Sequence, residues 1–228
     1  MKKMWCIPPK QDAEFVARME DVLEVYSRPY DEKRPVICMD EKPFQLLDEY
    51  IEPIKMSQGN HSLKYDCEYI RKGSCSIFMF TEPLGQWREA HARPHRTATD
   101  WAYELKWLID ERYSDADKIV LVMDNLNTHN ISSFYKAFSP NEAFRLSQKL
   151  EIHFTPKHGS WLDIAEIELS ALTVQTLLGV RIPSIEKLNS IIDGWYSARN
   201  ANQKGVQWHF TSDDARIKLR HIYPEIKF

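Results

Sequence analysis

The chain has 228 residues, 43% of them hydrophobic and 28% charged, and a formal net charge of −3. This composition is typical of a folded globular protein and excludes a long disordered chain. The near-neutral charge leaves a nucleic-acid partner open, because local patches matter more than the total. Four cysteines without a CxxC pair, a start without an apolar run and the lack of any stretch of roughly 18 apolar residues predict reduced thiols, no signal peptide and no membrane span.

The N-terminal part of the chain predicts one helix and one buried strand. Apolar residues at helical spacing predict a helix over 12–26, capped by Asp12, which we expect to be loosely attached to the rest of the fold. Four apolar residues, 36–39, then predict a buried strand that ends at Asp40.

The next segment predicts antiparallel strands followed by a helix. Alternating apolar and polar residues over 65–93 are typical of two or three antiparallel strands, with turns near Gly73 and Gly85. A helix is expected from Thr97 to about Tyr113, because the threonine is a good N-cap and the following apolar residues recur at helical spacing.

The second half of the chain alternates strands and helices. The run over 119–123 is continuously apolar and ends at Asp124, as expected of a central strand covered on both faces. Further elements follow in the order short helices over 130–149, a strand over 150–156, a helix with its N-cap at Ser160, a helix over 184–200 and a last helix capped by Thr211 or Ser212. This order predicts an α/β arrangement with a mixed sheet.

Two aspartates occupy equivalent places in the predicted sheet. Asp40 and Asp124 are each the first charged residue after an apolar strand. Ligands of α/β sheets gather at the carboxyl ends of strands, so these two side chains could share a site. The alternative is that both are turn formers or helix caps, which are common at strand ends.

The stretch TPKHGSWLDIAEIEL (155–169) adds three carboxylates. At about 100° per residue, Asp163 and Glu166 fall on one polar seam of the predicted helix and Glu168 falls on another. The helix dipole explains Asp163 but explains Glu166 less well, because core residues flank it, and Glu168 is expected to be structural. Carboxylates from two strands and one helix would repel each other without a cation, and such hard oxygen ligands suit Mg²⁺ or Mn²⁺.

Three segments, taken together, resemble a known family. MDEKPFQLL (39–47), VMDNLNTH (122–129) and TPKHGSWLDIAEIELS (155–170) resemble the DDE transposases of bacterial insertion sequences in the mariner superfamily. The resemblance implies an α/β fold with a ribonuclease H-like mixed sheet flanked by helices. It also implies a linker helix region over 1–33 and a DDE catalytic domain over 34–228 that ends in a helical tail.

The same resemblance implies a set of site residues. The catalytic, metal-binding triad would be Asp40, Asp124 and Glu166, with two Mg²⁺ ions expected and Mn²⁺ as a substitute. The residues expected to support the site or to lie near DNA are Glu41, Asn125, His129, His158 and Asp163. The residues expected to contact the DNA backbone are Arg88, Arg93, Arg96 and Lys157, with solvated surface positions as the equal alternative for each.

The activity that the resemblance implies is a Mg²⁺-dependent DNA endonuclease and strand transferase. It would act on transposon ends and target DNA as a homodimer on paired ends, in the bacterial cytoplasm and associated with the nucleoid. Two departures from the family matter. Asp163 stands where the family usually has Asn, and only 39 residues precede Asp40, too few for the helix-turn-helix units that read terminal repeats. We therefore expect the catalytic half of a transposase, whose missing half is a separate chain or has been lost.

Two alternatives to an active transposase domain stay open. One is a catalytically inactive or incomplete remnant that acts only as a DNA-binding or partner protein, and an intact triad argues against it. The other is a nuclease of the same fold that acts on RNA. The sequence identifies neither the terminal repeat nor the target site, nor whether the chain is active without a DNA-binding region.

Overall fold

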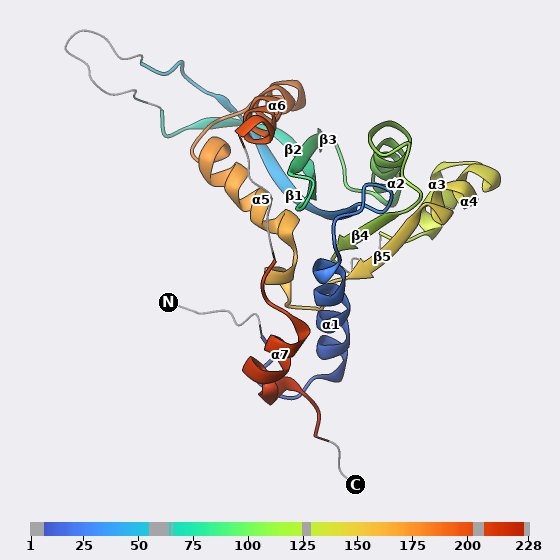
Figure 1. Cartoon of the computed structure of the whole chain (residues 1–228). Helices are drawn as coiled ribbons and strands as arrows, with labels where there is room; N and C mark the ends of the chain where they lie inside the picture. The colour runs from blue at the N-terminus through green and yellow to red at the C-terminus, as the bar shows by residue number, and fades with distance from the viewer. Residues whose placement is uncertain (1–6, 55–63, 65, 125–128, 203–207, 226–228) are drawn as a thin grey trace.

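One mixed sheet of five strands, in the order β3-β2-β1-β4-β5, forms the centre of the protein (Figure 1). The computed structural model describes residues 7–54, 64, 66–124, 129–202 and 208–225. The strands are β1 (Val36–Glu49), β2 (Tyr69–Glu82), β3 (Trp87–Arg93), β4 (Ile119–Met123) and β5 (Leu150–Phe154). Strand β2 is antiparallel to both β1 and β3, whereas β4 is parallel to both β1 and β5. The predicted α/β class with a mixed sheet is confirmed.

Helices cover both faces of this sheet. They are α1 (Ala13–Ser27), α2 (Ala98–Trp107), α3 (Ser132–Ala137), α4 (Pro140–Gln148), α5 (Ile164–Leu172), α6 (Ile185–Asn202) and α7 (Ser212–Lys218). Helices α2, α3 and α4 lie on one face, and α1, α5 and α6 lie on the other (Figure 1). None of the helices that the structure describes is long and apolar enough to cross a bilayer.

The alternation of side chains along β1 divides the core between these two faces. Ile37 and Met39 belong to the core under α2, α3 and α4, whereas Cys38 belongs to the core under α1, α5 and α6. Because successive side chains of a strand point to opposite faces, Asp40 faces the α5 side and Glu41 faces the α2 side. Two consecutive acids are thus placed on opposite sides of one sheet.

Two of the predicted strand boundaries are wrong. Strand β1 does not end at Asp40 but continues to Glu49, because β2 pairs with it along this whole length while β4 stops at Met123. Gly73 is not in a turn: it lies inside β2 with a φ of +101°, opposite the point where the pairing register with β1 shifts. A β-bulge with a glycine in a left-handed conformation explains both the φ of Gly73 and the shift in register.

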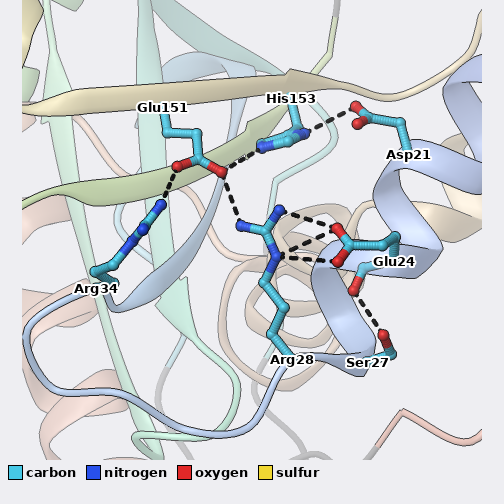
Figure 2. A network of polar contacts seen from close by, with 7 residues as sticks. All are labelled: Asp21, Glu24, Ser27, Arg28, Arg34, Glu151 and His153. Atoms are coloured by element: carbon cyan, nitrogen blue, oxygen red, sulfur yellow. Dashed lines mark hydrogen bonds and ion pairs between the residues drawn. The ribbon is translucent and has the colours of Figure 1, made fainter.

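Helix α1 is firmly packed, so the expectation of a loosely attached helix is wrong. Six of its side chains are buried in the core that α5 and α6 share. Its polar side is tied to β5, as Figure 2 shows: Arg28 donates to Glu151 at 2.8 Å, and His153 lies 2.8 Å from Asp21. The hydrogen bond from Arg28 is the main reason that the pKa of Glu151 falls to about 2. The division of the chain into a linker helix region over 1–33 and a catalytic domain over 34–228 remains a prediction.

The C-terminal segment packs against the start and middle of α1. The amide of Asp12 donates to the carbonyl of Ile222 at 2.9 Å. Glu20 of α1 accepts from Arg216 at 2.9 Å and from the hydroxyl of Tyr223 at 2.8 Å. The helical tail is therefore part of the same structure as the N-terminal helix.

Candidate active site

The pairing of β1 with β4 brings two aspartates together. Cys38 pairs with Val122 and Met39 pairs with Met123 in parallel register. The residues that follow these pairs in the two strands' direction are Asp40 and Asp124. The alternation of side chains puts both on the face that α5 covers. The two acids therefore lie where β4 ends and β1 continues without a partner on that side.

The third acid comes from the first turn of α5. The predicted N-cap at Ser160 is wrong: residues Ser160–Leu162 form a single 3₁₀ turn, and the helix begins at Ile164 with Asp163 as its N-cap. The side chain of Asp163 accepts a hydrogen bond from the amide of Ala165 at 2.9 Å. Both serine and aspartate are good caps, so the sequence does not distinguish them. Asp163 consequently lies outside the helical seam predicted for it.

Asp40, Asp124, Asp163 and Glu166 line one pocket with a volume of about 750 Å³. The remaining residues of its wall come from the start of α1 and from the loop after β5: Asp12, Glu14, Phe15, Arg18, Thr155, Pro156, Lys157, His158, Gly159 and Ser160. The structure thus brings the predicted triad to one place. The contribution of α1 was missed, because no pattern in the sequence shows where this helix packs.

The acids of this pocket raise one another's pKa values. Burial raises the pKa of Asp40 to about 7, and the negative charges of Asp124 and Glu166 add to the effect against the opposing amide of Glu41. Burial also holds the pKa of Asp163 well above its ordinary range, with further contributions from Asp40, Asp124 and Glu166. Like charges in a low-dielectric site favour protonation or the binding of a cation.

The chemistry of these donors fits a hard divalent cation. All four acids offer carboxylate oxygens, and Oδ2 of Asp163 is buried with no hydrogen-bond partner among the described residues. Mg²⁺ and Mn²⁺ prefer such ligands. In the part of the chain that the structure describes, no three His, Cys, Asp or Glu side chains are already grouped so that they could hold one metal ion.

A buried pair lies on the opposite face of β1, behind the acids. Nδ1 of His129 is 3.4 Å from Oε2 of Glu41, and the two side chains are 0% and 1% exposed. The ring of Trp101 stacks on His129 with the centroids 5.7 Å apart. Burial raises the pKa of Glu41 to about 8 and lowers that of His129 to about 4, so burial favours the uncharged form of both groups. His129 therefore cannot approach DNA in this conformation and instead supports the strand ends from behind.

Arg88 is not a DNA-backbone residue in this structure. Its side chain is 1% exposed, and its Nε lies 3.1 Å from Oε2 of the buried Glu168. The side chain of Asn200 accepts from the Arg88 amide at 3.0 Å and donates to its carbonyl at 2.8 Å. Because α5 and α6 cover this part of β3, the prediction is corrected. Glu168 has the structural role expected of it, as the partner of Arg88 and of Arg199 at 3.3 Å.

The other predicted basic residues differ in their surroundings. Arg93 is half-exposed and paired with the buried Glu104. Arg96 is exposed, and its positive charge lowers the pKa values of Asp40 and Glu41, against the larger effect of burial. Lys157 lines the pocket together with His158, whose φ of +67° belongs to a tight turn. Asn125 lies outside the described residues.

The family model of the DDE superfamily endonucleases matches residues 35–189, and the chain belongs to this family.

Solved structures of the Mos1 mariner system share the fold. The Mos1 mariner paired-end complex with Mn has a TM-score of 0.52 and 16% identity, over 87% of this chain and 59% of that chain. A pre-cleavage Mos1 transpososome has a TM-score of 0.56 and 14% identity, over 100% of this chain and 68% of that chain. This chain thus spans about three fifths of the length of the first of these structures. A search of curated proteins found no match.

Proposed function

We propose that this chain is the catalytic domain of an insertion-sequence transposase, a metal-dependent DNA endonuclease and strand transferase. The observation that carries the proposal is the pocket in which Asp40, Asp124 and Glu166 meet. Membership of the DDE superfamily endonucleases supports it. Bacterial origin, Mg²⁺ dependence and the action on transposon ends are parts of the proposal.

Asp40, Asp124 and Glu166 would hold the divalent ions with their carboxylate oxygens. When bound, such ions stabilise the charge of a phosphodiester under attack and lower the pKa of a coordinated water. The Mos1 complexes solved with Mn and with Mg support the choice of metal. The buried pair of Glu41 and His129 would keep the ends of β1 and β4 in position.

The reaction would proceed in two phosphoryl-transfer steps. Water first attacks the phosphorus at the transposon end, and the P–O bond that breaks leaves a free 3′-hydroxyl. This hydroxyl then attacks a phosphate of target DNA, forming one phosphodiester bond as another breaks. Arg96 and Lys157 would bind backbone phosphates through their positive charges, and His158 would lie beside them as a further polar contact.

The replacement Asp124→Asn tests the proposal. Nicking of a supercoiled plasmid that carries the genomic flanks of this reading frame, with Mn²⁺ present, should fall by more than about 100-fold, since even groups that only support metal ligands contribute 10–100-fold. Circular dichroism should show an unchanged fold. Asp48→Asn, at the far end of β1, is the matched control and should nick like the parent. Equal nicking by Asp124→Asn and the parent would refute the triad.

A catalytically inactive remnant is the second candidate. It is favoured by the lack of a ready-made group of three metal ligands among the described residues. An inactive remnant would bind DNA without binding Mn²⁺ in a calorimetric titration, even at millimolar metal. Pairing of two ends by a homodimer, and a separate helix-turn-helix chain that reads the repeats, belong to the active proposal. The Mos1 paired-end complexes support the homodimer on paired ends.

A further inference from the structure

Asp163 has a carboxylate where the structure requires only a cap. One oxygen accepts from the amide of Ala165, which completes the N-cap of α5. The other oxygen, Oδ2, is buried without a hydrogen-bond partner, and the residue is 3% exposed. A buried polar atom without a partner costs free energy, and an asparagine would cap the helix equally well. Capping alone therefore does not account for the charge-bearing group.

In the described part of the chain, no cationic side chain compensates Asp163. Among the described residues, no lysine, arginine or histidine forms an ion pair with it. The uncharged side chains nearby do not donate a hydrogen bond to its free oxygen either. The hydroxyl of Tyr26 instead donates to the carbonyl of Leu162 at 2.6 Å and lies 3.3 Å from the sulfur of Cys38. The negative charges of Asp40, Asp124 and Glu166 all raise the pKa of Asp163 further, beyond the effect of burial.

We propose that Asp163 is a fourth acidic group of the divalent-cation site, and that its carboxylate makes the site bind cations more tightly than the triad alone. The inference rests on the proposed function, because it assumes that Asp40, Asp124 and Glu166 hold the ion. The pocket that all four residues line, and the unpartnered buried oxygen within it, support the assignment.

The proposal has two consequences of opposite sign. With cation bound, the fourth charge adds attraction, so its loss weakens binding. Without cation, the fourth carboxyl group adds the cost of burying an acid among three like charges, so its replacement by neutral asparagine stabilises the folded protein. A residue that only caps α5 would leave cation binding unchanged when replaced by asparagine.

Calorimetric titration of the metal-free chain with MnCl₂ tests the first consequence. Asp163→Asn should raise the Kd for Mn²⁺ by about 10-fold or more, the range found for residues that support metal ligands. Thermal unfolding in EDTA tests the second, and the variant should unfold at a higher temperature than the parent. Asp12→Asn is the matched control: it makes the same change at the N-cap of α1 in the same pocket, and should leave the Kd unchanged.

The outcomes separate this inference from the proposed function. If the parent binds Mn²⁺ and Asp163→Asn binds it equally tightly, Asp163 is only a cap and the inference is overturned while the triad stands. If the parent binds no Mn²⁺, both fail. Should Asp163→Asn not fold, Asp163→Ser retains a good cap without the charge. The same weaker Mn²⁺ binding and higher unfolding temperature in EDTA are then expected of Asp163→Ser. If the triad is correct, Glu166→Gln should lose Mn²⁺ binding whether Asp163 is a fourth acidic group or only a cap.

Discussion

Arg88 and Glu168 form an ion pair that water does not reach. Their side chains are 1% and 7% exposed, and burial lowers the pKa of Arg88 against the attraction of Glu168. Removing Arg88 leaves the buried Glu168 with only the partly exposed Arg199 as a partner, which compensates its charge poorly in a low-dielectric environment. Their contribution is therefore to the stability of the packing between β3, α5 and α6.

Arg88→Ala should reduce the free energy of unfolding by about 3–5 kcal/mol. The measurement is urea denaturation followed by circular dichroism. The double variant Arg88→Met with Glu168→Leu should recover much of this loss, because it removes both buried charges and leaves only the partly exposed Arg199 without Glu168. A single variant as stable as the parent would mean that the pair is solvated in solution.

At the scale of single residues, the sequence predicted which acids share the pocket better than it predicted their surroundings. Local patterns place Asp40 and Asp124 after apolar runs and Glu166 early in a helix. Their role as a catalytic triad is what the family resemblance implies, and it remains a prediction. Arg88 was misplaced because nothing in the local sequence shows that α5 and α6 cover β3. The cap of α5 was misplaced because Ser160 and Asp163 are both good capping residues.

At the scale of elements, α2 is joined to β3 by a histidine that carries a charge. Nδ1 of His91 lies 2.6 Å from Glu104 of α2, and its Nε2 lies 3.2 Å from Glu89 of β3. Burial alone would lower the pKa of His91, but these two hydrogen bonds outweigh it and raise the pKa to about 9. Arg93 is the other cation on Glu104, and the ring of Trp107 meets the imidazole edge-on.

The stability of this junction should fall at alkaline pH. The pKa of His91 is raised on folding, so its contribution is complete below the unfolded value of about 6.5 and is lost as pH rises through about 9. The loss amounts to about 3 kcal/mol as an upper bound. Urea denaturation at pH 6.5 and pH 9.5 measures it. His91→Gln should show a smaller difference between the two pH values, and an equal difference would contradict the assignment.

The hydrophobic patterns predicted the order of the elements, but they did not predict the length of β1. Asp40, Glu41 and Lys42 are charged or polar, and Pro43 lacks an amide donor, so this run is typical of a strand end. The strand nevertheless continues because β2 pairs with one of its edges as far as Glu49, whereas its described pairing with β4 on the other edge ends at Met39. Pairing between distant segments, which a local pattern does not contain, decides where β1 ends.

At the scale of the whole molecule, the charge opposes the proposed partner. The chain has a net charge of −3, and its pocket is lined by acids, whereas DNA is a polyanion. Binding must therefore depend on a few local cations and on counterion release from the phosphates. Arg96 lowers the pKa of Asp40 by its charge, and Arg18 and Lys157 line the pocket, so these cations lie near the acids.

Affinity for duplex DNA should fall steeply with salt, and Arg96→Ala should reduce the slope of log K against log salt by about 1. Fluorescence anisotropy with a labelled duplex in Ca²⁺, over a range of KCl concentrations, measures the slope. Arg145→Ala is the control, because Arg145 of α4 is engaged with Glu142 and Asp110. An unchanged slope for Arg96→Ala would show that Arg96 makes no phosphate contact.

The contact between the amide of Asp12 and the carbonyl of Ile222 brings the two ends of the described chain to one spot. This spot adjoins the first turn of α1, which forms part of the pocket wall. A module tethered to either end would therefore start from the same place, beside the acids, and would need only a short linker to reach DNA bound there. The chain is for the same reason a suitable scaffold for circular permutation, in which the two ends are joined and new ones are opened elsewhere.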